Sequence, residues 1–254
     1  MDRSTFVSRL DGRLRTGDFA DVDASANGLQ VGRDDGTVEH AAFAVDAAAE
    51  TIDAAAATGA DLLVTHHGLI WGGVERLTER HYDLVRRLVE ADLGLYVSHL
   101  PLDAHPELGN AAGVADLLDL GEREPFGRLS GEHVGVRGRR SATDLQGLVD
   151  RLEGALDLGD GGVRALPFGP DRVEDVAVVT GSGADWLGEA VEAGADAFVT
   201  GEGKQQVYHE AKEAGVSVVL AGHYATETFG VRSLQSLAGE WGVETTFVEA
   251  PTGL

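Results

Sequence analysis

Cysteine is absent from the 254-residue chain, and lysine is nearly absent, with Lys204 and Lys212 the only two. Without thiols the chain can form neither disulfide bonds nor the thiolate zinc sites of small structural metal domains. No apolar run approaches the ~20 residues that cross a bilayer, and residues 1–5 lack the apolar core of a secretory signal. We therefore expect a cytoplasmic protein that does not span a membrane.

Basic residues are scarce overall, with 20 against 43 acidic residues and a formal net charge of −23. A field of that sign repels phosphate backbones and anionic lipids, so nucleic acids and membranes are disfavoured as partners. An acidic, lysine-poor surface is typical of proteins from a salt-rich cytoplasm, where charge repulsion is screened over ~3 Å at 1 M salt. We interpret the charge as a halophilic composition that carries little information about the ligand.

Strands and helices alternate along most of the chain, which predicts the α/β class with largely parallel sheets. The length suffices for one large domain or two small ones. The expected strands cover residues 41–45, 61–65, 93–98, 132–136, 173–179, 197–200, 216–220 and 244–248. The expected helices cover residues 4–14, 47–58, 79–91, 107–118, 143–156, 184–193, 203–214 and 226–241.

One seven-residue segment occurs twice. Residues 59–65 and 194–200 are identical at five of seven positions, and each copy leads through a helix into a strand that ends in a His-x-x-x-acid pattern. We predict one domain over residues 1–254, made of two related α/β lobes of approximately 1–125 and 126–254. Open parallel sheets bind ligands beyond the carboxyl ends of their strands, which places the functional site at the seam between the lobes.

Histidines and carboxylates follow these expected strands. His66 and His67 are neighbours on a strand, where successive side chains point to opposite faces, so they suit two metal ions better than one. A carboxylate such as Asp103 can bridge two ions. His223 and Glu227 stand at i and i+4, and if they begin a helix their side chains share one face. We predict a dinuclear centre with five ligands: His66, His67, Asp103, His223 and Glu227. Five ligands leave two ions unsaturated, which is typical of catalytic sites.

Nitrogen and oxygen donors without thiolates suit two divalent transition metal ions per chain, with Zn, Mn, Fe, Co and Ni all compatible. His99 can ligate, support a ligand, or act as a general acid–base group. Glu202 stands where the first copy has its histidine pair, and it is a candidate base or water-orienting group. The same carboxylate also fits a helix N-terminus. Asn27-Gly28 is typical of a turn, and residues 180–183 form a tight turn or a weak anion contact.

Several motifs resemble the dinuclear metal-centre protein family, whose members are often catalogued as GTP cyclohydrolase 1 type 2 homologues. These motifs are Asn27-Gly28-Leu29-Gln30-Val31, Thr65-His66-His67-Gly68, residues 99–106, Thr200-Gly201-Glu202 and residues 222–227. The resemblance covers nearly the whole chain in the family's short form. It implies the same five ligands and a homohexameric ring with its metal sites facing an internal cavity. Many relatives have a histidine after Thr-Gly-Asp, where this chain has Gln205-Gln206 after Thr-Gly-Glu.

These patterns favour a metal-dependent hydrolase in which a metal-activated hydroxide attacks an electrophilic carbon of a nucleotide or similar heterocycle. For GTP the target would be guanine C8, with release of formate. A two-metal phosphoester hydrolase is the enzymatic alternative. A metal-binding scaffold, metallochaperone or regulatory ring without turnover is the alternative outside enzymes.

Overall fold

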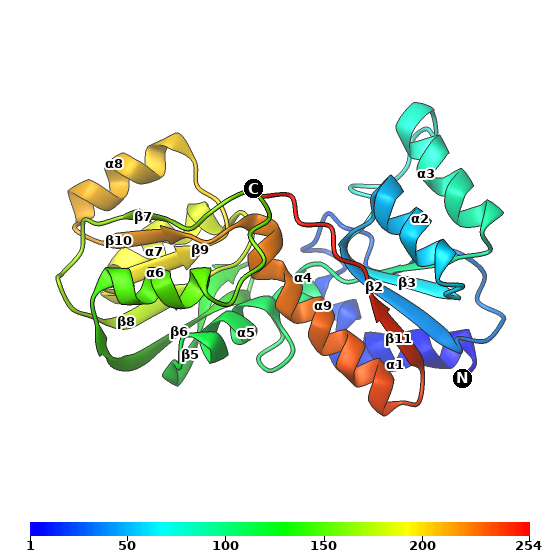
Figure 1. Cartoon of the computed structure of the whole chain (residues 1–254), viewed down its shortest axis with the longest axis horizontal. Helices are drawn as coiled ribbons and strands as arrows, with labels where there is room; N and C mark the ends of the chain where they lie inside the picture. Colours follow the sequence, from blue (N-terminus) through cyan, green and yellow to red (C-terminus); the bar gives the residue numbers. More distant parts are fainter. The chain divides into compact units, whose positions relative to one another are not determined.

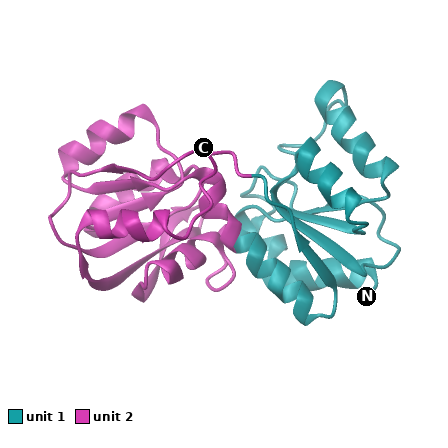
Figure 2. Cartoon of the chain, viewed as in Figure 1, with its two compact units in different colours: residues 1–102, 230–250 teal, residues 103–229, 251–254 magenta.

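The computed structural model describes all residues 1–254, which divide into two compact units (Figure 2). Unit 1 comprises Met1–Leu102 and Gly230–Ala250, and unit 2 comprises Asp103–Phe229 and Pro251–Leu254. The units are interleaved along the chain, which passes between them inside helices α4 (Leu100–Asp103) and α9 (His223–Glu240) and again between Ala250 and Pro251. They therefore do not coincide with contiguous lobes that meet near residue 125, and the division into two repeat lobes stays a prediction.

Unit 1 contains a five-stranded sheet in the order β1-β4-β3-β2-β11. Strands β4, β3, β2 and β11 run parallel, and β1 joins the edge antiparallel to β4. The strand bounds are β1 (Gly28–Val31), β2 (His40–Asp46), β3 (Leu62–His67), β4 (Gly94–Val97) and β11 (Glu244–Phe247). The helices of this unit are α1 (Arg3–Leu14), α2 (Ala49–Ala57), α3 (Glu79–Glu90) and the later part of α9, with a 3₁₀ turn at Thr16–Phe19.

Both faces of this sheet are buried. Alternate strand residues such as Leu63 and Leu95 form one apolar cluster with Ile52 of α2 and Leu88 of α3, and Figure 1 shows these two helices over the same face. On α1, Phe6, Leu10 and Leu14 are buried at helical spacing, and Phe6 contacts Trp241 edge-to-face with ring centroids 5.6 Å apart. Burial on both faces explains why the central strands are apolar runs without polar alternation.

Unit 2 contains a six-stranded sheet in the order β5-β6-β8-β9-β10-β7. Its centre, β8 to β10, is parallel, and β5, β6 and β7 pair antiparallel. The strands are β5 (Gly121–Leu129), β6 (Glu132–Thr143), β7 (Arg164–Leu166), β8 (Val173–Val178), β9 (Ala197–Thr200) and β10 (Ser217–Leu220). The helices are α5 (Asn110–Leu117), α6 (Leu145–Glu153), α7 (Leu187–Ala193), which follows a 3₁₀ turn at Gly183–Trp186, and α8 (Gln205–Ala214). Helices α5 and α6 share one apolar cluster with the central strands.

The sequence repeat corresponds to a structural repeat. Asp61 precedes β3, and its carboxylate accepts hydrogen bonds from the backbone N–H groups of Glu39 and His40. Asp196 precedes β9, and its carboxylate accepts from the backbone N–H groups of Glu174 and Asp175 in the same way. Each aspartate thus fastens the start of its strand to the parallel strand before it. This shared role explains why Gly-Ala-Asp recurs.

The two His-x-x-x-acid patterns, by contrast, are not in the same structural register. Thr65 pairs with Val97 in the first sheet, and Thr200 pairs with Leu220 in the second. Three residues after Val97 is Leu100, and three residues after Leu220 is His223, so Leu100 rather than His99 is the structural counterpart of His223. Leu100 and His223 each begin a helix. The resemblance between the patterns is therefore one of spacing, offset by one residue.

The α/β class is confirmed, and most expected elements form within a few residues of their predicted bounds. The differences are β6, which extends seven residues beyond its predicted end at residue 136, the short helix α4, and three edge strands (β1, β5 and β7) that the periodicity does not predict. Two have an evident cause: β5 carries five exposed residues in succession and contains Pro125, and β7 has only three residues. No helix of the structure has the length and apolar character needed to cross a membrane.

Candidate metal centre

His66 and His67 end β3 and turn toward different neighbouring strands. His66 is fully buried, and its Nδ1 lies 2.9 Å from the carbonyl oxygen of Ser98, just beyond β4. His67 Nδ1 lies 2.8 Å from a carboxylate oxygen of Asp46, at the end of β2. Because these oxygens only accept hydrogen bonds, each Nδ1 carries the hydrogen, which leaves Nε2 as the ring nitrogen through which each histidine could ligate a metal ion.

His99 lies just beyond β4 and is oriented by the segment that precedes β1. Its Nδ1 lies 2.9 Å from Asp23 Oδ1, and its backbone N–H donates to Asn27 Oδ1 at 2.7 Å. Burial alone would raise the pKa of Asp23, but the hydrogen bond and charge of His99, with donation from Asn27 and the Ser25 backbone, lower it overall. Asp23 therefore remains a carboxylate at neutral pH and fixes His99 as it would fix a metal ligand.

The three imidazoles form one cluster inside unit 1. The ligand nitrogens of His66, His67 and His99 all lie within 4.8 Å of one another, and the ring centroids are 4.6 to 5.8 Å apart. Each Nδ1 has an oxygen acceptor outside the cluster, which leaves the other ring nitrogen of each histidine for a ligand. Three converging imidazole nitrogens could hold a metal ion.

Unit 2 presents a second set of donors at the start of α9. His223 Nε2 lies 3.2 Å from Glu227 Oε2, one helical turn away, and His223 Nδ1 lies 3.2 Å from Glu202 Oε1. Burial lowers the pKa of His223, but the hydrogen bonds and charges of Glu227 and Glu202 outweigh it and raise that pKa to about 9. The His223 imidazole is therefore protonated near neutral pH, and a metal ion that binds it would have to displace a proton.

Carboxylates complete this second set. Glu227 is 3% exposed, and a carboxylate oxygen of Asp103 lies within 4.8 Å of its own. Asp103 Oδ1 accepts a hydrogen bond from the side-chain amide of the buried Asn110 at 2.8 Å. The pKa of Glu202 is lowered, chiefly by a hydrogen bond from Ser182 Oγ, which outweighs partial burial.

Two glycines make room for these donors. Gly201 occupies the place that His66 has in the first repeat, and a Cβ there would lie 2.8 Å from His223 Cα and 2.7 Å from the Gly181 carbonyl oxygen. A Cβ on Gly181 would lie 2.1 Å from Glu227 Oε1. The start of α9 therefore leaves no room for a side chain at position 201, where the first repeat has His66.

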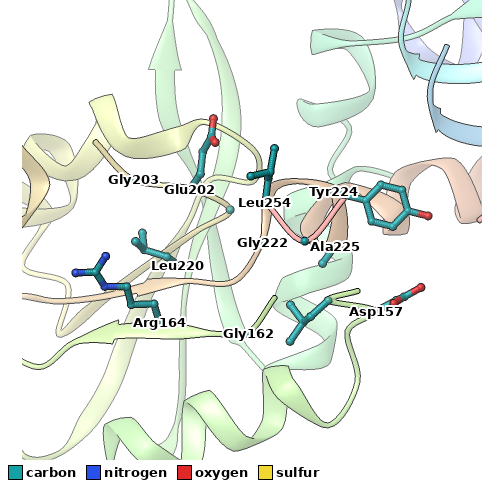
Figure 3. A pocket seen from close by; sticks show the side chains of 13 residues that line it. Asp157, Gly162, Arg164, Glu202, Gly203, Leu220, Gly222, Tyr224, Ala225 and Leu254 are labelled. Carbon is teal, nitrogen blue, oxygen red and sulfur yellow. The ribbon is translucent and has the colours of Figure 1, made fainter. Parts of the chain in front are cut away.

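The turn at residues 180–183 is not built to hold an anion on its backbone. The N–H of Gly181 donates to Thr226 Oγ1, and the N–H of Gly183 donates to Thr200 Oγ1. Next to this turn, a cavity of about 160 Å³ is lined by Glu202, Arg164, Leu220 and several glycines. Figure 3 shows the Glu202 and Arg164 side chains on either side of Leu220, with the Tyr224 ring directed away from them. Glu202 thus borders both this cavity and His223.

The structure therefore brings the predicted residues together in two groups: His66, His67 and His99 in unit 1, and Asp103, Glu202, His223 and Glu227 in unit 2. Their roles as ligands or acid–base groups stay predictions. The sequence pattern did not reveal the supporting residues Asp23, Asp46, Asn110 and Ser182, which lie up to 76 positions from their partners. Asn27 and Ser182 belong to segments that the sequence predicts as turns, but their supporting roles are not visible there: the Asn27 amide oxygen accepts from the backbone N–H of His99, and Ser182 Oγ donates to Glu202.

Both groups fit divalent transition metals by the chemistry of their donors. Imidazole nitrogens and carboxylate oxygens, with no thiolate in the chain, suit borderline ions such as zinc, manganese and iron. Each histidine of the cluster, His66, His67 and His99, donates its Nδ1–H to an oxygen, the arrangement found behind most metal-bound histidines.

Comparison with known proteins finds relatives along the whole chain. The sequence pattern of the Duf34/NIF3 (NGG1p interacting factor 3) family matches residues 1–252. A Halobacterium salinarum protein called GTP cyclohydrolase 1 type 2 homolog is 58% identical over 100% of both chains. A Deinococcus radiodurans protein of the same name is 41% identical, over 99% of this chain and 94% of its own.

Solved structures show the same fold. The structure of protein ybgI, described as of unknown function, superposes with a TM-score of 0.91 at 31% identity over 100% of both chains. The crystal structure of TTHA1606 from Thermus thermophilus gives a TM-score of 0.88 at 39% identity, again over 100% of both chains. With the match over residues 1–252 and the full-length relatives, the chain belongs to the Duf34/NIF3 family.

Proposed function

We propose that the chain is a dinuclear metal-dependent hydrolase that acts on a nucleotide or a related heterocycle. Two divalent transition metal ions would be held by His66, His67, Asp103, His223 and Glu227. The observation that carries the proposal is the cluster of three imidazoles in unit 1, because each Nδ1 is held by an oxygen acceptor and the ligand nitrogens converge. A cluster built only for packing has no need of three such acceptors.

The covalent chain supports treating the two groups of donors as one centre. Asp103 follows His99 by four residues, which span at most ~14 Å when extended and about 6 Å in a helix such as α4. A carboxylate of unit 2 is thus tied to the histidine cluster by a single short helix. Glu227 would belong to the same centre, because its carboxylate lies within 4.8 Å of that of Asp103.

When bound, two such ions would supply Lewis acidity to water and to an oxygen-rich substrate. The chain's own groups would handle the proton. Glu202, held by Ser182 and with a lowered pKa, remains ionised and can accept a proton from water or orient it. His99 is fixed through Nδ1 by Asp23 and can move a proton at Nε2, or it can ligate.

The name of the relatives supports a nucleotide substrate. If GTP is the substrate, hydrolysis would open the guanine ring at C8 and release formate. A phosphoester hydrolase would instead release inorganic phosphate, and a scaffold or metallochaperone would hold the metal without turnover. The products therefore separate these functions.

The test combines metal content with product analysis. Protein purified without chelator is analysed for metal, loaded to saturation and incubated with GTP. We expect close to two ions per chain, formate release, and a sharp loss of both in Asp103→Ala and His223→Ala. His209→Ala, a substitution on α8 outside both donor groups, is the matched control. Phosphate alone would favour the phosphoesterase. No product from fully loaded protein across a panel of nucleotides would contradict a hydrolase and favour the scaffold or metallochaperone.

A further inference from the structure

Unit 1 contains a second feature beside its histidine cluster, a cavity of about 770 Å³. It is bordered by β1, by the loop that joins β3 to α3, and by the first turns of α3. The walls are mainly apolar, and lining residues include Gln30, Leu69, Trp71, Arg76, Leu77 and His81. This volume is within the range of pockets that enclose small organic ligands, about 300–1,000 Å³.

Trp71 is shared between the cavity and the histidine cluster. Its ring lies edge-on to that of His99, with centroids 4.9 Å apart, and its centroid is 6.2 Å from that of His67. The side chain is 43% exposed even though it is one of the largest apolar groups of the chain. A flat, accessible indole at this place can stack on a planar ring in the cavity.

The Trp71 wall is held in place by the backbone. Its indole N–H donates to the carbonyl oxygen of Gly68 at 3.1 Å. On either side of Trp71, the N–H of Gly72 donates to the Ala24 carbonyl, and the Ile70 carbonyl accepts from the N–H of Ala26. Residues 23–27 therefore fasten this wall and, through Asp23 and Asn27, also fasten His99. A ring stacked on Trp71 would be positioned relative to the cluster by one common support.

The cavity also offers a positive charge. Arg76 lines it and makes no ion pair with a carboxylate, in a chain whose net charge is −23. An unpaired guanidinium matches a phosphate or carboxylate group. The surrounding negative field disfavours a long polyanion, which leaves small anions as the better match.

We propose that this cavity binds the planar ring of a small anionic aromatic compound, with the ring against Trp71 and the anion near Arg76. A nucleoside monophosphate is a simple soluble compound of this description. The inference deepens the proposed function, because it assigns a substrate class to the same centre. Binding can nevertheless be measured without turnover.

The test is calorimetric titration of the full chain with AMP, adenosine and ribose 5-phosphate, with metal loaded and again after chelation. We expect AMP to bind in both states. Trp71→Ala should weaken AMP and adenosine about tenfold or more, in line with ring stacking, whereas Arg76→Gln should weaken AMP several-fold and leave adenosine unchanged. Tyr82→Ala, an exposed aromatic on α3 that does not line the cavity, is the control. Metal content should stay the same in all three variants.

Equal AMP affinity in wild type, Trp71→Ala and Arg76→Gln would overturn the proposal. AMP binding that is lost on chelation and that neither substitution weakens would overturn it as well. The absence of AMP binding, together with a fall in oligomeric mass in Trp71→Ala, would also overturn it and would show that this face joins copies of the chain. None of these results depends on formate or phosphate release. The cavity proposal can therefore be disproved independently of the proposed hydrolase activity.

Discussion

At the scale of single residues, the site depends as much on the groups behind the donors as on the donors. The His66-His67 pair and the two His-x-x-x-acid patterns are visible in the sequence because they repeat the same residue types at the same spacing after apolar runs. Their supports are ordinary acids and amides that become meaningful only when folding places them. Asp46 ends β2 and Asp23 lies in a turn-rich segment, and nothing local marks either as the partner of an imidazole.

Asp46 allows a direct test of this support. Replacing Asp46 with alanine removes the acceptor that orients His67, and we expect metal affinity to fall about 10- to 100-fold. Competition with a chromogenic chelator measures the change. Asp35→Ala, which removes an exposed carboxylate paired with Arg33, is the control. Unchanged affinity in Asp46→Ala would show that His67 needs no orienting partner.

His223 predicts a pH dependence in the metal-free protein. Its pKa in the folded state is about 9, above the unfolded value of 6.5, because Glu227 and Glu202 outweigh burial. The folded state therefore binds this proton more tightly, and the stabilisation, at most about 3 kcal/mol, is complete below pH 6.5 and lost as pH rises through 9. Urea unfolding in EDTA from pH 6 to 9 should show this loss in wild type. The loss should be absent in His223→Gln, and an equal loss in both would contradict the assignment.

At the scale of elements, apolar periodicity predicts the buried parallel strands and their helices, because those segments are buried on both faces. It fails at three of the four edge strands, β1, β5 and β7, and succeeds only at β11. In β5 the exposed charges and a proline conceal a strand whose partner β6 supplies the pairing. The offset between the two His-x-x-x-acid patterns was also beyond prediction, since strand register is set by pairing partners rather than by spacing.

Gly201 makes the packing at the start of α9 testable. A Cβ there would lie under 3 Å from the Gly181 carbonyl, His223 Cα and Thr226 Oγ1. Gly201→Ala should therefore destabilise the protein by about 1–3 kcal/mol, and it should lower metal affinity by displacing His223. Gly188→Ala in α7, where a Cβ meets nothing within 4 Å, should be neutral or stabilising by up to ~1 kcal/mol. Urea unfolding compares them, and equal stabilities would contradict the tight contact.

At the scale of the whole molecule, the net charge of −23 opposes the compact state by self-repulsion. Screening shortens from ~10 Å at 0.1 M salt to ~3 Å at 1 M. We therefore expect the unfolding free energy to rise as KCl increases from 0.1 to 2 M, measured by thermal or urea unfolding. Stability that is flat or falls over this range would contradict the halophilic interpretation.

The homohexameric ring implied by family resemblance also belongs to this scale and stays a prediction. Light scattering on the metal-loaded protein should then give six times the mass of one chain.

The central claim is that donors from both compact units hold one pair of metal ions. Anomalous diffraction from crystals of metal-loaded protein tests it most directly. We predict two peaks per chain ~3.5–4 Å apart, bonded to His66 and His67 from unit 1 and to Asp103, His223 and Glu227 from unit 2. A single peak on the histidines of unit 1, or peaks that never share donors from both units, would contradict the account.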